Sequence, residues 1–576
     1  MLKTLAGSVR QYALLSILAP ILVIGESLAD VVIPQLMIGL IDNGINVGNM
    51  QVIWTTGIRL LILAVLATIC GIAAAWASSK ASAGFSCNLR QDLFYNLQNF
   101  SFRNIDRFST ASLITRLTTD VTNIQNAYMM ILRITVKSPV MLIFAVIMSF
   151  RINGRLALIY LGAIPVLAVC LVFIIRYAHP RFRKVFTLYD RLNNVVQEDL
   201  RGIRVVKAFV REEHEREKFY DVSERIFRLF SKAEKAISLC IPIMQLCIFA
   251  CLLLVSWFGA HLITSGVMTT GELIAITNYA FHILFSLLML SVVFVMITIS
   301  RASAERVCEV LDERSDITTH ADPVTEVKDG SIRFENVDFS YAGDPDKLCL
   351  THVDLEIAAG ETVGILGGTG SSKSTLVQLI PRLYDVTNGT VYVGGVDVRD
   401  YDLNALRDQV AMVLQKNVLF SGTIRENLRW GDENASDEEM ERVCRLAQAD
   451  SFIREFPDGY DTYIEQGGSN VSGGQKQRLC IARALLKKPK ILILDDSTSA
   501  VDTATDAQIR KAFLEEIPDT TKLIIAQRIA SVQDADTIIV MDNGTVSAVG
   551  DHETLLATSD IYREVYESQV KGGDDT

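Results

Sequence analysis

Residues 362–375 read Thr362-Val363-Gly364-Ile365-Leu366-Gly367-Gly368-Thr369-Gly370-Ser371-Ser372-Lys373-Ser374-Thr375. The first five residues form an apolar run with β-branched side chains, as expected of a buried parallel strand, and a helical run follows the loop at 376–380. In this strand–loop–helix setting, small residues let consecutive backbone N–H groups close around phosphate oxygens at a helix N-terminus. Lys373 would add positive charge for the terminal phosphates, and the Ser374 hydroxyl would reach Mg²⁺. The stretch therefore predicts a phosphate-binding loop for ATP.

One position in this loop departs from the common pattern, because Ser372 stands where glycine usually precedes the lysine. We expect a helical backbone at this position, which the small serine side chain tolerates. ATP binding should therefore survive the exchange.

Two further segments supply the rest of a nucleotide site. The apolar run at 491–494 ends in two carboxylates, of which Asp495 can hold the Mg²⁺ shell and Asp496 occupies the place of a general base. A glycine pair opens a helix in Val471-Ser472-Gly473-Gly474-Gln475, which predicts a second phosphate-binding tip without a lysine. That start could also be only a turn. Two such tips in one chain suggest that two domains meet head to tail, each tip completing the other's site.

The N-terminal half carries a membrane signal. The chain has 576 residues, is 50% hydrophobic and 21% charged, and its apolar residues concentrate in residues 1–300. A bilayer core of roughly 30 Å needs about 20 apolar residues as helix, and six segments meet this need, at roughly 12–41, 53–78, 128–150, 156–176, 237–263 and 273–298. The net charge of −11 argues against a nucleic-acid partner. We expect a multi-pass protein of the cell membrane with a cytosolic ATP domain.

The links between the segments alternate between short and long. The long links, 79–127 and 177–236, are charged, and each is expected to fold as a helical hairpin. Two arms of about 25 residues at 1.5 Å per residue would reach roughly 35 Å below the membrane. The predicted fold is an α-helical transmembrane bundle with long cytosolic extensions, followed by an α/β P-loop ATPase domain. We place the transmembrane domain at 1–315, a linker at 316–330 and the ATP-binding domain at 331–576.

A few polar side chains interrupt the spans. Glu26 and Asp30 lie one helical turn apart in the first span. Ionisable groups in a membrane are costly, so this pair could line a substrate pathway or a gate. The alternative, which we favour, is that the first span is broken beside Pro20 and Pro34 and that the pair lies near the outer surface, pairing with neighbours. For His282, Asn278 and Gln245, hydrogen bonds between helices are the favoured interpretation.

The order of the motifs resembles an ATP-binding cassette, and six spans ahead of it resemble an ABC exporter half-transporter. The likeness covers nearly the whole chain, including the segment 198–209 in the second arm. It implies that Tyr341 stacks on adenine and that Gln415 senses Mg²⁺ and the arms. It also implies that Ser472, Gly473 and Gln475 contact a γ-phosphate held by a second subunit, and that the segment Ser499-Ala500-Val501-Asp502 lies at the dimer interface. Short coupling helices near Phe108–Leu113 and Phe209–Arg216 would dock on the cassettes.

Two departures from the family pattern bear on mechanism. Asp496 stands where the family has its general-base glutamate, and Gln527 stands where it has its switch histidine. A carboxylate that is one methylene shorter can miss the attacking water, and an error near 1 Å can cost about 100-fold in rate. Glutamine can bond a phosphate but cannot carry the imidazolium charge. Together the departures resemble the degenerate-site subunit of a heterodimeric multidrug-type exporter. The chain would bind ATP at its own site and hydrolyse it poorly. It would also lend its Ser472–Gln475 tip to the hydrolytic site of a partner.

Two alternatives stay open from the sequence. The chain could be an ATP-gated channel or a membrane regulator that transports nothing, because slow hydrolysis also suits gating. It could also be a homodimeric exporter with two slow sites. The cargo, whether drug, lipid or peptide, is not named by any residue pattern.

Overall fold

The computed structural model describes residues 1–497 and 501–571, which form two compact units. One, called here the helical unit, comprises Met1–Gln98 and Thr110–Glu313. The other, called the α/β unit, comprises Asn99–Ser109 and Arg314–Thr576. The short segment 99–109 therefore leaves the helical unit and folds with the ATP-binding part of the chain.

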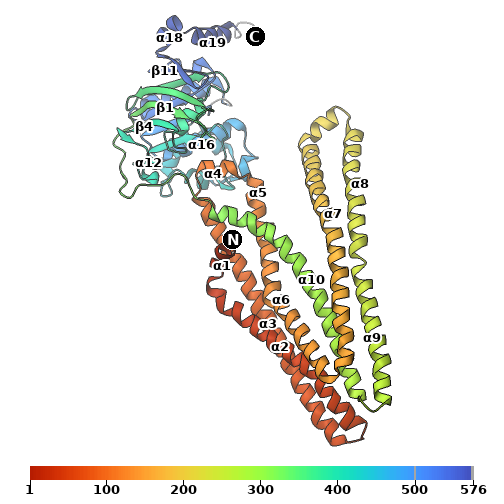
Figure 1. The fold of residues 1–576 in the computed structure, drawn as a ribbon. Coiled ribbons are helices and arrows are strands. Elements are labelled where there is room, and N and C mark those ends of the chain that lie inside the picture. Colours follow the sequence, from red (N-terminus) through yellow and green to blue (C-terminus); the bar gives the residue numbers. More distant parts are fainter. Residues whose placement is uncertain (498–500, 572–576) are drawn as a thin grey trace. The chain divides into compact units, whose positions relative to one another are not determined.

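The helical unit is built from long helices joined by short turns (Figure 1). Its elements are α1 (Leu2–Gly7), η1 (Arg10–Tyr12), α2 (Ala13–Gly39), η2 (Leu40–Ile45), α3 (Met50–Gln98), α5 (Thr110–Thr115), η3 (Arg116–Asp120), α6 (Val121–Ile152), α7 (Gly154–Ala208), α8 (Glu212–Ile237), α9 (Cys240–Thr264) and α10 (Thr270–Asp312). Within the described residues, six helical stretches are long and apolar enough to cross a membrane. Five of them contain a predicted segment entirely, and the fourth, Gly154–Ile174, overlaps the predicted 156–176, so the prediction of six spans is confirmed.

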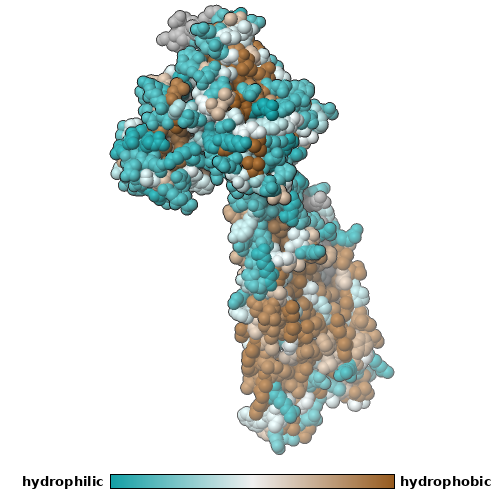
Figure 2. All heavy atoms as spheres, turned by 90° about the vertical axis from the view of Figure 1, so that its left-hand side faces the viewer, coloured by the Kyte–Doolittle hydropathy of each residue, from teal (hydrophilic) through white to brown (hydrophobic). Residues whose placement is uncertain are grey.

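The outer surface of these helices is apolar. Figure 2 shows hydrophobic side chains covering much of the helical unit between more polar ends. Large residues such as Phe173, Leu253 and Trp257 are 71%, 72% and 75% exposed, respectively. Such a surface would be unstable in water but suits lipid chains. The chain is a multi-pass membrane protein.

Local signals fix the ends of the spans on the side of the short turns. The side chain of Asn153 accepts hydrogen bonds from the backbone N–H groups of Arg155 and Leu156 and so begins α7. Thr269 and Glu272 form a reciprocal capping box at the start of α10. Both devices satisfy backbone donors that the helix itself leaves unpaired.

The long links fold as helical arms, as predicted. α7 and α8 run along each other and bury Val185, Val195, Val222 and Ile226 between them. At the tip of the other arm stands α4 (Phe102–Arg107), whose start is fixed by a capping box between Ser101 and Asn104.

The expected positions of the coupling helices were wrong in detail. The first arm has two short helices, α4 and α5, and the range Phe108–Leu113 begins after α4 ends and overlaps only the start of α5. In the second arm no separate short helix forms within Phe209–Arg216, because α7 ends at Ala208 and α8 begins at Glu212. A turn with a positive φ of 52° at Val210 joins them.

The α/β unit contains two main sheets. A six-stranded sheet has the order β12-β11-β3-β10-β9-β6, and a four-stranded antiparallel sheet has the order β2-β1-β4-β5. The strands are β1 (Ile332–Phe339), β2 (Leu350–Ile357), β3 (Thr362–Gly367), β4 (Asn388–Val393), β5 (Val396–Asp397), β6 (Val410–Val413), β9 (Ile491–Asp495), β10 (Thr521–Ile525), β11 (Thr537–Asp542) and β12 (Thr545–Gly550), with β7 (Gly422–Thr423) and β8 (Tyr463–Ile464) as a separate pair.

Helices and short turns surround these strands. They are α11 (Lys373–Gln378), α12 (Leu403–Gln409), α13 (Ile424–Leu428), α14 (Asp437–Leu446), α15 (Asp450–Glu455), η4 (Gly459–Asp461), η5 (Gln466–Gly468), α16 (Gly473–Leu486), α17 (Thr503–Glu516), η6 (Ile529–Ser531), α18 (His552–Thr558) and α19 (Asp560–Lys571). Apolar side chains pack in two cores. One joins the four-stranded sheet to α11 and to one face of the six-stranded sheet, and the other joins the opposite face of the six-stranded sheet to α14, α16 and α17.

Candidate nucleotide-binding site

Four neighbouring parallel strands bring the predicted site residues to one edge of the large sheet. β3 pairs with β10, β10 with β9 and β9 with β6, all in parallel. Ile525 lies opposite both Ile365 and Asp495, and Val413 lies opposite Leu494. The segments that follow these strands therefore emerge together, as expected at the carboxyl edge of a parallel sheet. They carry the glycine-rich loop, Gln527, Asp496 and Gln415.

The loop after β3 is held close to the sheet by glycine. A Cβ atom at Gly367 would lie 2.3 Å from the carbonyl oxygen of Met541, so only glycine fits there. Lys373 folds back over the loop and its Nζ donates to the carbonyl oxygens of Gly367 and Gly368, both at 2.8 Å. Gly368, Thr369 and Gly370 are exposed, which leaves their backbone N–H groups accessible to a phosphate chain. The predicted loop thus forms as expected in outline.

The expectation of a helical backbone at Ser372 was wrong. This residue has φ 69° and ψ 24°, which is the left-handed conformation, and it directly precedes α11. The left-handed region is unfavourable for residues with a Cβ atom, and the cost is of order 1–3 kcal/mol. This conformation explains why glycine is usual at this position. With serine, the same loop conformation is less favourable in free energy than it would be with glycine.

Replacing Ser372 with glycine is expected to stabilise the ATP-binding loop by about 1 kcal/mol, because the left-handed backbone then carries no Cβ strain. ATP should bind roughly fivefold more tightly, which isothermal titration of the purified chain would measure. Ser372→Ala is the matched control, since it removes the hydroxyl but keeps the strained Cβ. An equal gain from both variants would show that the hydroxyl, and not the backbone, is responsible.

Ser374 and Asp495 meet where a divalent cation would be held. The Ser374 Oγ donates to Asp495 Oδ1 at 2.9 Å, and Asp495 is almost fully buried at the end of β9. Burial raises the pKa of Asp495, and the neighbouring Asp496 carboxylate adds to that shift, while Ser374 and Lys373 oppose it. Burial also lowers the pKa of Lys373. A hydroxyl and a carboxylate are oxygen donors of the kind Mg²⁺ prefers, so these residues fit that ion.

The two residues that depart from the family pattern lie in contact. Gln527 Nε2 donates to Asp496 Oδ2 at 3.1 Å, and Gln415 Nε2 approaches the same oxygen at 3.5 Å. Asp496 itself has a positive φ of 49°, and its backbone N–H donates to the Ile525 carbonyl. The structure therefore gathers Gln415, Asp496 and Gln527 around one carboxylate oxygen.

Tyr341 packs beside the loop. Its hydroxyl lies 3.0 Å from Thr375 Oγ1 and donates to Gln378 Oε1 at 3.3 Å, while the residue as a whole is 40% exposed. The ring meets that of Tyr384 edge to face, with the ring centres 5.1 Å apart. Tyr341 is thus fixed against α11 with part of its ring accessible. That it stacks on adenine stays a prediction.

The arm helix α4 contacts this same region of the α/β unit. The Tyr384 hydroxyl donates to Asp106 Oδ2 at 2.7 Å, and Arg103 donates to the Ala342 carbonyl at 3.3 Å. Burial raises the pKa of Tyr384, and the hydrogen bond to Asp106 raises it further. The residue that follows Tyr341 and the ring that packs on it therefore both contact α4.

The predicted second phosphate-binding tip has the geometry of a capped helix start. Ser472 Oγ accepts from the Gln475 N–H at 3.2 Å, and Gln475 Oε1 accepts from the Ser472 N–H at 2.9 Å. Ser472 and Gly473 are exposed at the start of the 14-residue helix α16. This start is a helix N-terminus and not only a turn. Gly474 follows within the first helical turn.

Part of the expected dimer-interface segment lies outside the described residues, namely Ser499 and Ala500. Asp502 is described, and its side chain accepts from the Thr505 N–H and so caps α17. Its place in an interface stays a prediction.

Sequence reasoning missed one residue that contacts the site. Gln569 of α19 accepts a hydrogen bond from the Ile529 N–H at 2.9 Å and donates to the Gln527 carbonyl at 2.8 Å. These two bonds hold the backbone on both sides of Arg528, directly beside Gln527. No motif or spacing marks Gln569, because the contact joins the last helix to a loop 40 residues earlier.

Comparisons with known proteins agree with this architecture. Residues 16–301 match the family model of the ABC transporter transmembrane region, and residues 350–499 match that of the ABC transporter. The uncharacterized ABC transporter ATP-binding protein YfiB of Bacillus subtilis is 38% identical over 97% of each chain. The ATP-dependent lipid A-core flippase of Desulfotalea psychrophila is 34% identical over 84% of each chain.

A solved structure has the same fold over nearly the whole length. The structure of a bacterial Atm1-family ABC exporter with ATP bound matches with a TM-score of 0.82 and 25% identity, covering 97% of this chain and 98% of that chain.

A membrane unit of six spans followed by a P-loop ATPase unit defines a transporter driven by ATP. The chain belongs to the ABC transporter family, and within it to the exporters that fuse one transmembrane region to one ATPase domain.

Proposed function

We propose that this chain is one subunit of a heterodimeric exporter that moves a hydrophobic or amphipathic compound out of the cytosol by alternating access. It binds ATP at its own loop, hydrolyses it poorly, and lends its Ser472–Gln475 tip to the hydrolytic site of a partner half-transporter. The observation that carries the proposal is the contact between Asp496 and Gln527.

The contact explains why two departures from the family pattern act as one. The carboxylate that should receive a proton from water is short, and its Oδ2 accepts from Gln527 Nε2. A carboxylate that is one methylene shorter, with one oxygen already accepting from an amide, orients an attacking water poorly. Gln527 cannot supply the positive charge that a histidine would bring near a γ-phosphate. Binding at Lys373 is untouched by either change.

Within the site, each of the chain's own groups has a separate task. The N–H groups of the exposed loop and Lys373 would bind the phosphates, and Ser374 and Asp495 would hold Mg²⁺, with Gln415 beside them. Bound Mg²⁺ would supply charge neutralisation between the phosphate oxygens. Tyr341 would face adenine. ATP held in this way can keep two cassettes together even where hydrolysis is slow.

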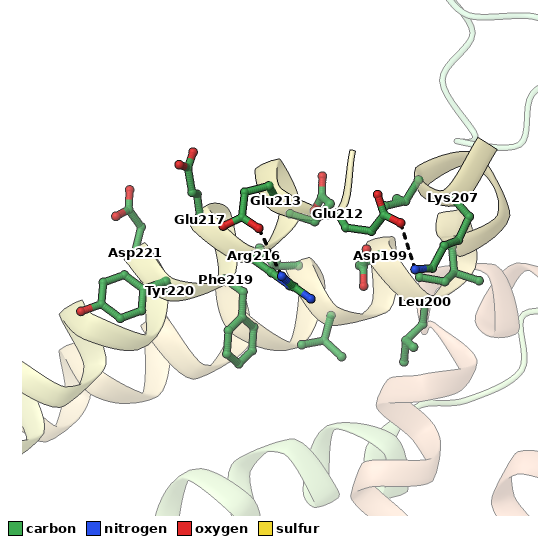
Figure 3. A pocket seen from close by; sticks show the side chains of 15 residues that line it. Asp199, Leu200, Lys207, Glu212, Glu213, Arg216, Glu217, Phe219, Tyr220 and Asp221 are labelled. Carbon is green, nitrogen blue, oxygen red and sulfur yellow. Dashed lines mark hydrogen bonds and ion pairs between the residues drawn. The ribbon is translucent and has the colours of Figure 1, made fainter. Parts of the chain in front are cut away.

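The tip of the second arm supports docking on another cassette. Figure 3 shows the groove between α7 and α8, where Glu212 pairs with Lys207 and Glu213 with Arg216. Just beyond the groove, Phe209 and Val210 are 72% and 79% exposed. Two large apolar side chains held out on a strained turn are typical of a contact surface. We infer that this turn seats on the partner's cassette.

Two observations support the proposed class of cargo, namely the names of similar proteins and the apolar surface of the spans. One relative bears the name of a lipid A-core flippase and a structural neighbour that of an Atm1-family exporter. For this chain the proposal is limited to an apolar or amphipathic compound.

Isolation of the tagged full chain from its own cells in mild detergent, followed by native mass measurement, tests the partnership. We expect a complex of this 63.8 kDa chain with one different half-transporter. A mass of two identical copies would contradict the heterodimer and favour the homodimeric exporter. Reconstituted in liposomes, the complex should show ATPase activity that cargo stimulates. Ionic current without cargo movement would instead favour a channel.

A further inference from the structure

A charged cluster lies among three spans of the helical unit. Lys137 of α6 pairs with Glu26 Oε1 at 2.5 Å and with Asp30 Oδ2 at 3.2 Å, both on α2. His282 of α10 lies close enough to interact electrostatically with Asp30 and Lys137. We call these four residues the span cluster. The expected pairing of Glu26 and Asp30 with neighbours is confirmed. The expected break in the first span was wrong, because α2 runs as one helix from Ala13 to Gly39 with both prolines inside it.

The span cluster is deep in the spans. At 1.5 Å per residue, Asp30 lies about 22 Å along the helix from Ile45, where its span ends, and Lys137 lies about 22 Å from Ile152. His282 lies roughly 18 Å from Thr270, the start of its span. Along their helices these residues therefore lie several turns from the ends, while the expected place near the outer surface stays a prediction. Charges at such depth are rarely kept unless they serve a function.

The charges in the span cluster do not balance. Two carboxylates face one ammonium group, so the three groups that form these ion pairs keep one negative charge. Glu26 Oε2 is buried and has no hydrogen-bond partner among the described residues. The side chains of Glu26 and Asp30 are only 15% and 27% exposed. An unpaired carboxylate oxygen in this environment is unfavourable until a cation or donor reaches it.

The opposite helix leaves space at this carboxylate. Gly71 of α3 faces Glu26, and a Cβ atom there would lie 3.3 Å from the carboxyl carbon. A larger residue would crowd the carboxylate. The Glu26 carboxylate is thus enclosed by α2, α3 and α6, with its second oxygen unused.

We propose that the span cluster binds the positively charged group of an amphipathic cation during export. This inference rests on the proposed export function and names its cargo class. The positive charge of the bound cation neutralises the remaining negative charge of the cluster. Lys137, which already pairs with both carboxylates, competes with the cation for them. Anionic cargo is disfavoured because it would meet a net negative charge in a medium of low dielectric constant.

The proposal predicts that removing the Lys137 charge and removing a carboxylate charge change the affinity for a cation in opposite directions. The full chain in nanodiscs of neutral phosphatidylcholine is titrated with a dansyl-labelled long-chain alkylammonium, with empty nanodiscs as the blank. The dansyl-labelled alcohol of equal chain length serves as the neutral probe. We expect Glu26→Gln and Asp30→Asn each to weaken binding of the ammonium about 10-fold or more. Lys137→Met should strengthen it by a similar factor. Binding of the alcohol should not change.

Controls separate this result from a damaged fold. Glu272→Gln makes the same exchange in α10 at the outer capping box, away from the cluster, and should leave both probes unaffected. Each variant should still bind a fluorescent ATP analogue as the natural chain does. If Lys137→Met weakens the ammonium as the carboxylate variants do, or if the ammonium and the alcohol bind alike, the cluster is only a structural tie and the inference is overturned.

The failure of this inference is distinguishable from failure of the export proposal. The isolated complex in inside-out vesicles is tested for ATP-dependent accumulation of both probes. Accumulation of the alcohol and the ammonium at equal rates, unaffected by Glu26→Gln, would leave export standing and remove the cation site. Accumulation of neither probe nor of any lipid analogue would instead contradict the export proposal. Preferred accumulation of the ammonium, lost in Glu26→Gln, would support both.

Discussion

The purified full chain carrying both Asp496→Glu and Gln527→His is expected to hydrolyse ATP about 100-fold faster than the natural chain. Glutamate extends the carboxylate by one methylene toward the attacking water, and histidine brings a group that can carry positive charge. Because Asp496 and Gln527 are joined by a hydrogen bond of 3.1 Å, each single exchange should yield much less than the pair. The measurement is steady-state phosphate release in nanodiscs at saturating ATP.

The control for this gain is a third exchange, Asp495→Asn, in the doubly substituted chain. Asp495 contacts the Ser374 hydroxyl, which is expected to share Mg²⁺ with it. The restored activity should therefore disappear while the protein stays folded. Rapid hydrolysis by the natural chain on its own would show that Asp496 is already competent, and the idea of a degenerate site would be falsified.

Gly473→Asp is expected to lower ATP hydrolysis by the assembled two-chain complex by about 100-fold or more. The new carboxylate would stand at the exposed start of α16, where the helix dipole and N–H groups are proposed to meet a γ-phosphate held by the partner. ATP binding at the Lys373 loop of the same chain should be unchanged, which a binding titration with the isolated chain would show. The loss should thus lie in the partner's site alone.

A matched exchange at another helix start tests the specificity of this effect. Ser436 is exposed and caps α14, and Ser436→Asp adds the same charge while keeping a good capping residue. Its complex should hydrolyse ATP normally. Normal activity of the Gly473→Asp complex would mean that the tip does not complete the partner's site.

The large features were predictable because they rest on local patterns. A span needs a continuous run of apolar residues. A P-loop needs its strand, glycines, lysine and helix in one continuous stretch. Both features therefore depend only on residues that are close in the sequence. The strand ends that gather Gln415, Asp496 and Gln527 follow from the parallel order of β6, β9 and β10. Each of these inferences depended on the spacing of residues along the chain or on a motif that occurs in a known arrangement of strand, loop and helix.

The errors arose where backbone shape or helix packing decides. The conformation of Ser372 depends on how the loop turns into α11, which residue type alone does not reveal. The pairing of Glu26 was expected, but its partner Lys137 depends on how α2 packs against α6. The start of α4 was recoverable, since Ser101 and Asn104 have the spacing of a capping box.

The bonds of Gln569 have a practical consequence for anyone who prepares this protein. Helix α19 is hydrogen-bonded through Gln569 to the backbone on both sides of Arg528. It therefore directly contacts the loop that carries Gln527. A fusion partner or purification handle attached behind that helix would therefore be joined to the helix that holds this loop. Rates measured with such material should be checked after the handle is cleaved, or the handle should be moved to the other end of the polypeptide.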